Sequence, residues 1–270
     1  MKLFSKIAVL AVAFSAAALH GAETINIADP TFIRPVFGKA TIANNEIKHV
    51  GKAFFFGSKH VAIDPAKKYT FKYTIVNNSD KAVTVYGGVD FYDANKKAHP
   101  AFCWQANPAT VTELAADAKA GDTELKVKSA TKWATHASTC IFRDAKKDSS
   151  DMPSPVANKV AESVKKVTKD GDIYILSLRV PLKKDITAGT SIRQHFLSGY
   201  YYLNGAAPTR VAPKQSRTVI STISNYAPVP GRYNQKNWPA GAKEFIFLFL
   251  SDYTDVKADV TIKDASITIE

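Results

Sequence analysis

The residues with the clearest chemical potential are aromatic side chains in segments rich in amides. Trp104 lies in AFCWQANP, and Trp238 lies with Tyr233 in YNQKNWPAG. Tyr201 is the middle one of three consecutive tyrosines, and at least one of the three must leave the core because neighbouring strand residues point to opposite faces. A flat ring with a polar edge is the usual platform for the apolar face of a sugar, and nearby amides orient its hydroxyls. These four residues predict a carbohydrate-binding surface.

The tryptophans also have a structural interpretation, which the sequence leaves open. Trp104 and Trp238 would serve equally well as plugs at the two ends of a β-sandwich, because an indole buries a large apolar area. Trp133 closes a short hairpin-like unit, and we expect it to be such a plug.

Arg193 and His195 alternate on one face of a predicted strand close to the tyrosines. In this arrangement the two side chains would hold a sugar carboxylate or sulfate, which suits the basic composition. The alternative is an arginine paired with a surface acid beside a solvated histidine. Arg193, His195 and Tyr201 would be the first candidates if the protein were a polysaccharide lyase or hydrolase.

Cys103 and Cys140 are the two cysteines of a chain that we expect to be exported, so we predict a disulfide between them. Two free buried thiols are the alternative. A structural calcium would find oxygen ligands in two groups of residues, although turn chemistry explains both groups without a metal. The first group is Asp90, Asp93 and Asn95, and the second is Asp252, Asp255 and Asp259.

Motifs of enzymes and of metal sites are missing from the sequence. It has no HExxH, no GxSxG, no paired CxxC, no glycine-rich phosphate loop and no EF-hand spacing. Its 6 histidines are scattered singly. We therefore assign no catalytic residue and no metal ligand, and we expect no cofactor other than the calcium considered above.

The first 22 residues have the pattern of a secretory signal peptide, with lysines before an apolar run from Ile7 to Leu19. The run is shorter than the roughly 20 residues that span a bilayer as a helix. We therefore expect no membrane span, and a protein that is secreted or periplasmic, in solution or associated with the cell surface.

The chain is basic, with a formal net charge of +12, but only 7 of its 36 basic residues are arginines. Recognition of phosphates and bases depends on arginine forks, whereas lysine is favoured on solvated surfaces. We therefore do not expect nucleic acid as a partner. A polysaccharide or a glycan surface, acidic in keeping with the charge, is the more credible partner.

The strands that would position these residues are clearest between Lys68 and Asp93. Apolar and aromatic residues alternate with polar ones in KYTFKYTIV and again in VTVYGGVDF, which is the period of half-buried strands. The turn cluster NNSDK separates them, so we expect an antiparallel hairpin whose aromatic face another sheet covers. At Gly87 and Gly88 we expect a bulge or the close approach of another backbone.

The rest of the chain shows the same preference for short strands. Residues 101–169 hold few large apolar side chains, so we expect an irregular excursion of short hairpins without a core of its own. Regular strands return in IYILSLRVPL, which is apolar on both sides like a central strand, and continue in EFIFLFLSDY and VTIKDASITIE. The sequence predicts an all-β antiparallel β-sandwich with a single domain from residue 23 to residue 270.

Several segments in this order resemble a known group of domains. They are VTVYGGVDFYDANKK, AGDTELKV, GTSIRQH with GYYYL, NWPAGAKEFIFLFLSDY and VTIKDASITIE. Together they resemble the jelly-roll domains, similar to carbohydrate-binding modules with a galactose-binding-like fold, of exported bacterial polysaccharide-degrading and phage tail proteins. The resemblance spans roughly residues 41–270, and it implies a jelly-roll sandwich that binds glycans without catalysis. We expect this chain, unlike those modules, to be a lone module without an attached enzyme.

Three functions follow from these observations. The first is a non-catalytic secreted protein that binds carbohydrate or a glycan-bearing surface. The second is a structural or adhesive cell-surface protein that uses the sandwich for protein contacts. The third, a polysaccharide lyase or hydrolase, requires a cleft in which carboxylates, histidine, arginine or tyrosine converge.

Overall fold

The computed structural model describes residues 22–98, 104–152, 156–196, 201–203, 209–227, 236–251 and 258–270, without the side chains of Val156, Tyr201 and Tyr202. These residues form β-strands and short 3-10 helices, η2 (Pro108–Thr110) and η3 (Val156–Asn158). All pairs of named strands are antiparallel, which confirms the predicted all-β, antiparallel fold class. No helix in the described part of the chain is long and apolar enough to cross a bilayer.

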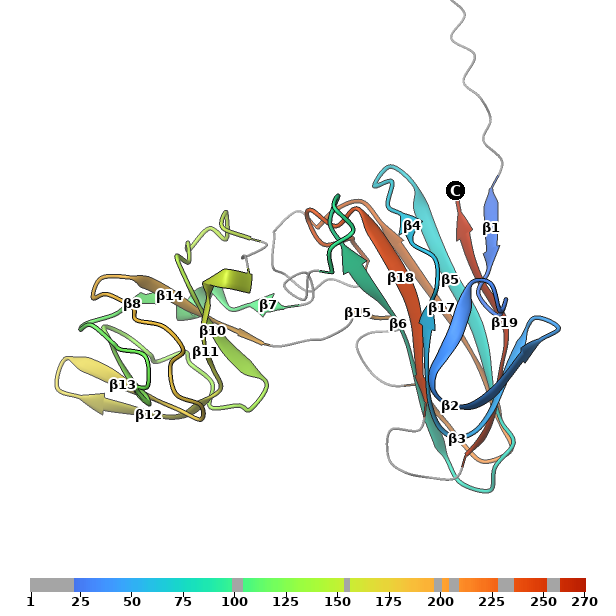
Figure 1. Ribbon diagram of the computed structural model, residues 1–270, viewed down its shortest axis with the longest axis horizontal. Coiled ribbons are helices and arrows are strands. Elements are labelled where there is room, and N and C mark those ends of the chain that lie inside the picture. Colours follow the sequence, from blue (N-terminus) through green and yellow to red (C-terminus); the bar gives the residue numbers. More distant parts are fainter. Residues whose placement is uncertain are drawn as a thin grey trace, which may run out of the picture.

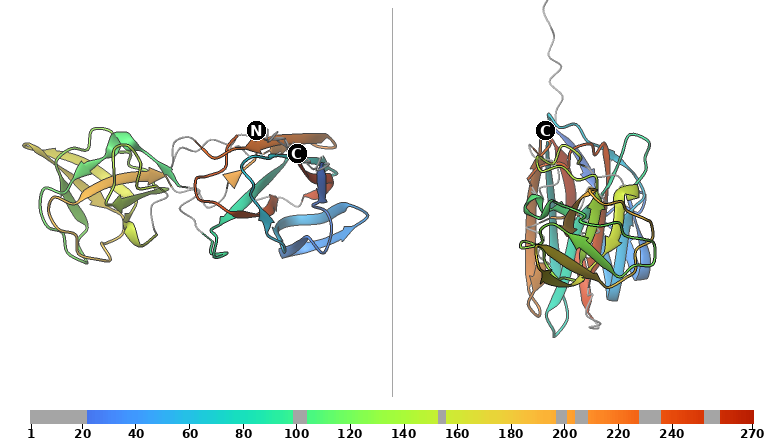
Figure 2. Two further views of the ribbon diagram at one scale, coloured as in Figure 1. Left: turned by 90° about the horizontal axis from the view of Figure 1, so that it is seen from above. Right: turned by 90° about the vertical axis from the view of Figure 1, so that its left-hand side faces the viewer.

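The strands fall into a larger and a smaller group, drawn at opposite ends of Figure 1 and again separate in Figure 2. The larger group holds β1 (Glu23–Asn26), β2 (Ile33–Ala43), β3 (Glu46–Gly57), β4 (Val61–Ala62), β5 (Lys68–Asn77), β6 (Val83–Tyr92), β15 (Tyr201–Tyr202), β16 (Thr209–Val211), β17 (Ser216–Ser224), β18 (Glu244–Ser251) and β19 (Asp259–Ile269). They form one sheet in the order β15-β6-β18-β3-β19-β5-β17, with β16 on β6, β2 on β3, β1 on β19 and β4 on β18.

The alternation predicted for β5 and β6 is confirmed, but their predicted pairing as a hairpin is wrong. β5 pairs with β17 and β19, whereas β6 pairs with β18. The two strands face each other across the core instead. A Cβ on Gly87 of β6 would lie 2.4 Å from the hydroxyl of Tyr73 on β5, so Gly87 makes room for this ring. The turn between the strands therefore carries the chain from one layer of a sandwich-like fold to the other.

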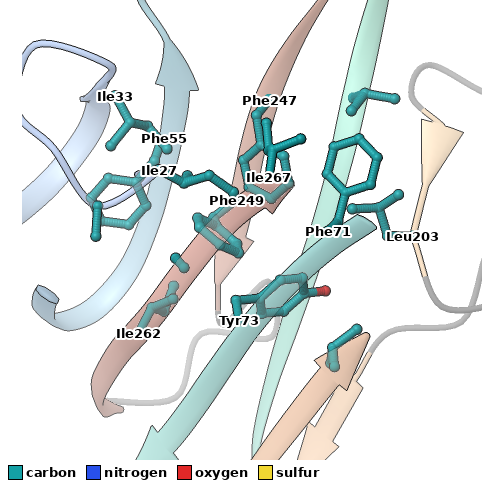
Figure 3. Close-up of a cluster of buried hydrophobic side chains, with 14 of the residues drawn as sticks. Ile27, Ile33, Phe55, Phe71, Tyr73, Leu203, Phe247, Phe249, Ile262 and Ile267 are labelled. Carbon is teal, nitrogen blue, oxygen red and sulfur yellow. The ribbon is translucent and has the colours of Figure 1, made fainter. Parts of the chain in front are cut away.

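Aromatic side chains fill the space between these layers. Phe245, Phe247 and Phe249 alternate along β18 and are fully buried. Their rings contact those of β5, with centroids 6.0 Å apart for Phe71 and Phe247 and 5.0 Å apart for Tyr73 and Phe249 (Figure 3). Burial of such side chains contributes roughly 1.5–3 kcal/mol each, so this cluster is the main source of stability in the larger group.

Asn77 helps to close the rolled sheet. This residue is 1% exposed at the end of β5, and its side-chain amide donates hydrogen bonds to the carbonyls of Lys81, Val211 and Ala212 at 2.8, 3.1 and 3.0 Å. The contacts join β5 to β16, which itself pairs with β6. The buried Asn77 amide, which is hydrogen-bonded to three carbonyls, thus links β5 to β16, two strands that do not pair through their backbones.

The smaller group comprises residues 104–196. Its strands are β7 (Gln105–Ala106), β8 (Thr112–Glu113), β9 (Glu124–Val127), β10 (Thr139–Arg143), β11 (Lys159–Glu162), β12 (Val164–Asp170), β13 (Ile173–Leu178) and β14 (Ser191–Phe196). One sheet has the order β11-β10-β14-β7 with β8 on β14, and another has the order β12-β13-β9. β13 is thus a central strand, as its two-sided apolar pattern predicted.

The smaller group has its own hydrophobic cluster, which includes Leu125, Val127, Ile141, Val164 and Ile192, all fully buried. Residues 101–169, which we expected to have no core of their own, supply part of this cluster, and β13, β14 and the segment between them supply the rest. The cluster thus pools apolar residues that are scattered in sequence. The division of residues 23–270 into domains stays a prediction.

Candidate functional site

Trp238 does not offer a ring face to a ligand. Its side chain is fully buried in the larger group, stacked on Phe245 at 5.2 Å and edge-on to Tyr69 at 4.9 Å. Its backbone also pairs with the loop after β17, since the Trp238 N–H donates to the carbonyl of Asn225. The prediction of a sugar platform at Trp238 is corrected here, because the flanking loop folds the indole inward onto the aromatic core.

Trp104 is also a core residue. It is 7% exposed and packs on Phe142 with ring centroids 4.8 Å apart, in the smaller group and in a cluster separate from that of Trp238. The two indoles therefore cannot form one binding surface. Trp133 is buried as expected, and its indole N–H donates to the carbonyl of Thr110. Tyr233 lies outside the described residues, and Tyr201 is described only as a backbone paired with Val89.

Arg193 and His195 are fully buried and do not reach a ligand. The Arg193 guanidinium donates to both carboxylate oxygens of Asp151, at 3.1 and 2.6 Å, and to the carbonyl of Lys146 at 2.9 Å. Its Nε donates to Nε2 of His195 at 3.1 Å. Thus the arginine pairs with an acid, as the alternative stated, but this acid is largely buried and the histidine is not solvated.

The pKa of His195 is lowered to about 3, mainly by burial and in part by the nearby Arg193 charge. The imidazole is therefore neutral and acts as a hydrogen-bond acceptor. Because Arg193 is held by Asp151, the pair serves as an internal brace between β14 and the chain after β10, and it supports neither sugar binding nor catalysis at this position.

Cys140 is buried in the same part of the core, and burial raises the pKa of its thiol to about 12. Its predicted partner Cys103 lies outside the described residues, so the disulfide stays a prediction. The first calcium group is occupied by turn hydrogen bonds, because Asp93 Oδ1 accepts the N–H groups of Asn95 and Lys97. Asp252 and Asp255 fall outside the described residues, among which no group of three or more metal-ligating side chains occurs.

A cavity of about 480 Å³ lies at one end of the larger group, and we call it the β1–β19 cavity. β1, β4, the end of β19 and the turn before β5 surround it, and Figure 1 places these elements at the same end of the sheet. Its lining residues are Glu23, Ile25, Phe32, Lys59, His60, Val61, Ala62, Asp64, Lys67, Tyr69 and Ile269. Sequence analysis selected none of them.

Local hydrogen bonds shape this cavity. β1 closes one side because Glu23 pairs with Ile269 at the end of β19. On the other side the Tyr69 hydroxyl accepts the N–H of Asp64 at 2.8 Å and donates to the carbonyl of Ala62 at 2.9 Å. The hydroxyl thereby fixes the turn between β4 and β5. An apolar floor with fixed walls is the usual form of a small-molecule site.

The chemistry of the lining is mixed. The buried side chains of Phe32, Val61 and Tyr69 supply apolar surface, while lysines and carboxylates stand at the sides. Burial is the main cause that raises the pKa of Tyr69, with smaller contributions from the carboxylates of Asp64 and Glu23. His60 is held at the edge by the Glu244 carboxylate, 2.8 Å from its Nδ1. The arrangement can bind a compact ligand that has both apolar faces and polar groups.

Sequence reasoning missed this cavity because its residues come from four separate segments: 23–25, residue 32, 59–69 and residue 269. None of these segments has a motif. The one local signal was the turn at Asp64, whose Oδ1 accepts the N–H of Ala66. Turn chemistry of this kind is common, and it says nothing about a cavity until the partner strands are known.

Comparisons with known proteins identify no relative. No known protein family matches this sequence, and no curated protein is similar to it. A structure of infectious bursal disease virus, Gx strain, aligns over 92% of this chain and 41% of its own, so this chain spans less than half of that length. The alignment has 9% sequence identity and a TM-score of 0.18, which carries no argument about fold or function.

Proposed function

We propose that this protein is an exported, non-catalytic carbohydrate-binding protein with a galactose-binding-like jelly-roll fold. The ligand occupies the β1–β19 cavity rather than the surface around the tryptophans. The signal-peptide pattern supports a secreted or periplasmic location, and the antiparallel two-layer arrangement is compatible with a jelly roll. The partner is a polysaccharide or a glycan-bearing surface.

The cavity is the observation that carries this proposal. Its volume of about 480 Å³ lies within the roughly 300–1,000 Å³ range of small-molecule sites. A sugar ring has apolar C–H faces and a rim of hydroxyls. The ring of Phe32 and the apolar edge of Tyr69 suit those faces, and Asp64 and Glu23 offer oxygens to hydroxyl donors.

A cavity-filling variant tests the proposal. Ala62 is an exposed residue that lines the cavity, so Ala62→Trp places an indole in the volume that the sugar would occupy. Ala43→Trp is the matched control, because Ala43 is an exposed strand residue that does not line the cavity. The measurements are retention in affinity electrophoresis and binding to a glycan array.

We expect the wild type and Ala43→Trp to bind the same glycans and Ala62→Trp to lose this binding. Circular dichroism and thermal unfolding would show that both variants are folded. If the wild type binds no neutral or acidic glycan, the proposed function is wrong. If Ala62→Trp binds as well as the wild type, the cavity is not the site.

One observation favours a second function, contact with another protein. Val36 and Phe37 on β2 and Val50 on β3 are 57%, 43% and 66% exposed. The ring centroids of Phe37 on β2 and Phe54 on β3 lie 5.9 Å apart, so part of this apolar surface spans the two paired strands. Exposed apolar surface of this kind marks interaction sites. Sedimentation velocity as a function of concentration, with Phe37→Ser as the variant, tests whether the paired strands β2 and β3 mediate assembly.

A further inference from the structure

Lys67 is a charged residue in the lining of the β1–β19 cavity. The residue is half-buried, and in the described part of the chain its ammonium has neither a hydrogen-bond acceptor nor a carboxylate partner. Its neighbour Lys68, by contrast, forms an ion pair with Glu270 outside the cavity. Since no carboxylate of the described chain competes for the Lys67 ammonium, an anion in the cavity would gain more here than at a lysine that already has an ion-pair partner.

A second ammonium lines the same cavity. Lys59 has a weak contact at 3.4 Å from its Nζ to the Thr31 hydroxyl, and its charge also helps to lower the pKa of the Asp29 carboxyl, which does not line the cavity. Of the two acids in the lining, Asp64 already accepts the N–H of Ala66 at one of its oxygens. The cavity thus presents two lysines to a negative group, together with carboxylate oxygens for hydroxyls.

We propose that the β1–β19 cavity is specific for an acidic sugar, whose carboxylate or sulfate group is bound by Lys67 and Lys59. This inference rests on the proposed carbohydrate-binding function, and it names the ligand class within that function. The remainder of the sugar ring lies against the apolar floor formed by Phe32 and Tyr69. The net charge of +12 raises the local concentration of an acidic polymer but does not by itself select an acid group at one site.

The experiment compares two lysine variants with the same change in net charge. Lys67→Gln removes the cavity ammonium, whereas Lys72→Gln removes an exposed ammonium on β5 that does not line the cavity. The probes are an oligogalacturonate, its neutral methyl ester and a sulfated galactose oligomer, measured by isothermal titration calorimetry at two salt concentrations. A neutral glycan array is run alongside with the wild type.

We expect the wild type to prefer an acidic probe over the methyl ester, and Lys67→Gln to weaken that binding about tenfold or more. Lys72→Gln is expected to change it less than twofold. The two acidic probes distinguish a carboxylate from a sulfate as the bound group.

Three outcomes overturn the inference. Equal losses of affinity for the acidic probe in the two variants would show that its binding depends on the overall charge of the protein rather than on the cavity. Binding of neutral glycans without preference for an acid would refute the acidic ligand and leave the carbohydrate-binding function standing. Binding of no glycan of either kind would refute both.

Discussion

Replacing Arg193 by methionine tests whether this residue is an internal brace or a ligand-binding group. The guanidinium is fully buried and donates to both oxygens of Asp151, to the Lys146 carbonyl and to His195 Nε2. Methionine retains most of the apolar volume but donates no hydrogen bond. The variant therefore leaves the Asp151 carboxylate, with a side chain only 11% exposed, without its charge partner.

The size of the effect follows from this geometry. Removing one partner of a buried ion pair costs about 3–5 kcal/mol, because the other charge remains desolvated. Replacing both partners by apolar residues is often close to neutral. We therefore expect Arg193→Met to destabilise the smaller group by about 3–5 kcal/mol, and the double variant Arg193→Met with Asp151→Leu to recover most of this loss.

Urea unfolding followed by tryptophan fluorescence measures the loss of stability. Trp104 reports on this part of the core, because its ring packs on Phe142, whose ring centroid lies 4.4 Å from that of His195. Hydrogen exchange of β14 peptides assigns the change to the smaller group. Arg179→Met is the control, since Arg179 is exposed and should change stability by less than about 0.5 kcal/mol. A loss below about 1 kcal/mol in Arg193→Met, or unchanged stability with lost glycan binding, would refute the brace.

Two further predictions concern the larger group. Gly87→Ala should destabilise the protein by about 1–3 kcal/mol, because the new methyl group meets the buried Tyr73 hydroxyl, and thermal unfolding measures this. Gly87→Ala should cost less in a Tyr73→Leu background, which lacks both the hydroxyl and the ring atoms that the methyl group meets, and an undiminished loss there would contradict the clash. Burial raises the pKa of Asp90 to about 6, so the stability of the wild type relative to Asp90→Asn should fall as pH rises from about 4 to 6 and then level off. Melting temperatures at pH 4 to 8 check this, and a difference independent of pH would contradict it.

The candidate site shows where sequence reasoning stops. The aromatic residues near amides were predicted to bind sugars, but Trp238 lies inside the core, and Arg193 pairs with Asp151. The sequence of a loop does not show whether an aromatic side chain in it points into the core or toward solvent, because that depends on the apolar surface against which the loop packs. The cavity was not predictable, since Glu23 and Ile269 become neighbours only when β1 pairs with β19.

The sequence alone determined the chain's local structure. Alternation in KYTFKYTIV and VTVYGGVDF assigned the buried faces of β5 and β6 correctly, because side chains of a strand point to opposite sides with a period of two. Only the tertiary structure decided which strands pair. The alternation of residues along a strand determines which of its faces is apolar, but which strand pairs with each of its edges depends on how the whole core packs. For that reason β5 faces β6 across the core, and the cavity forms where β1, β4 and β19 meet.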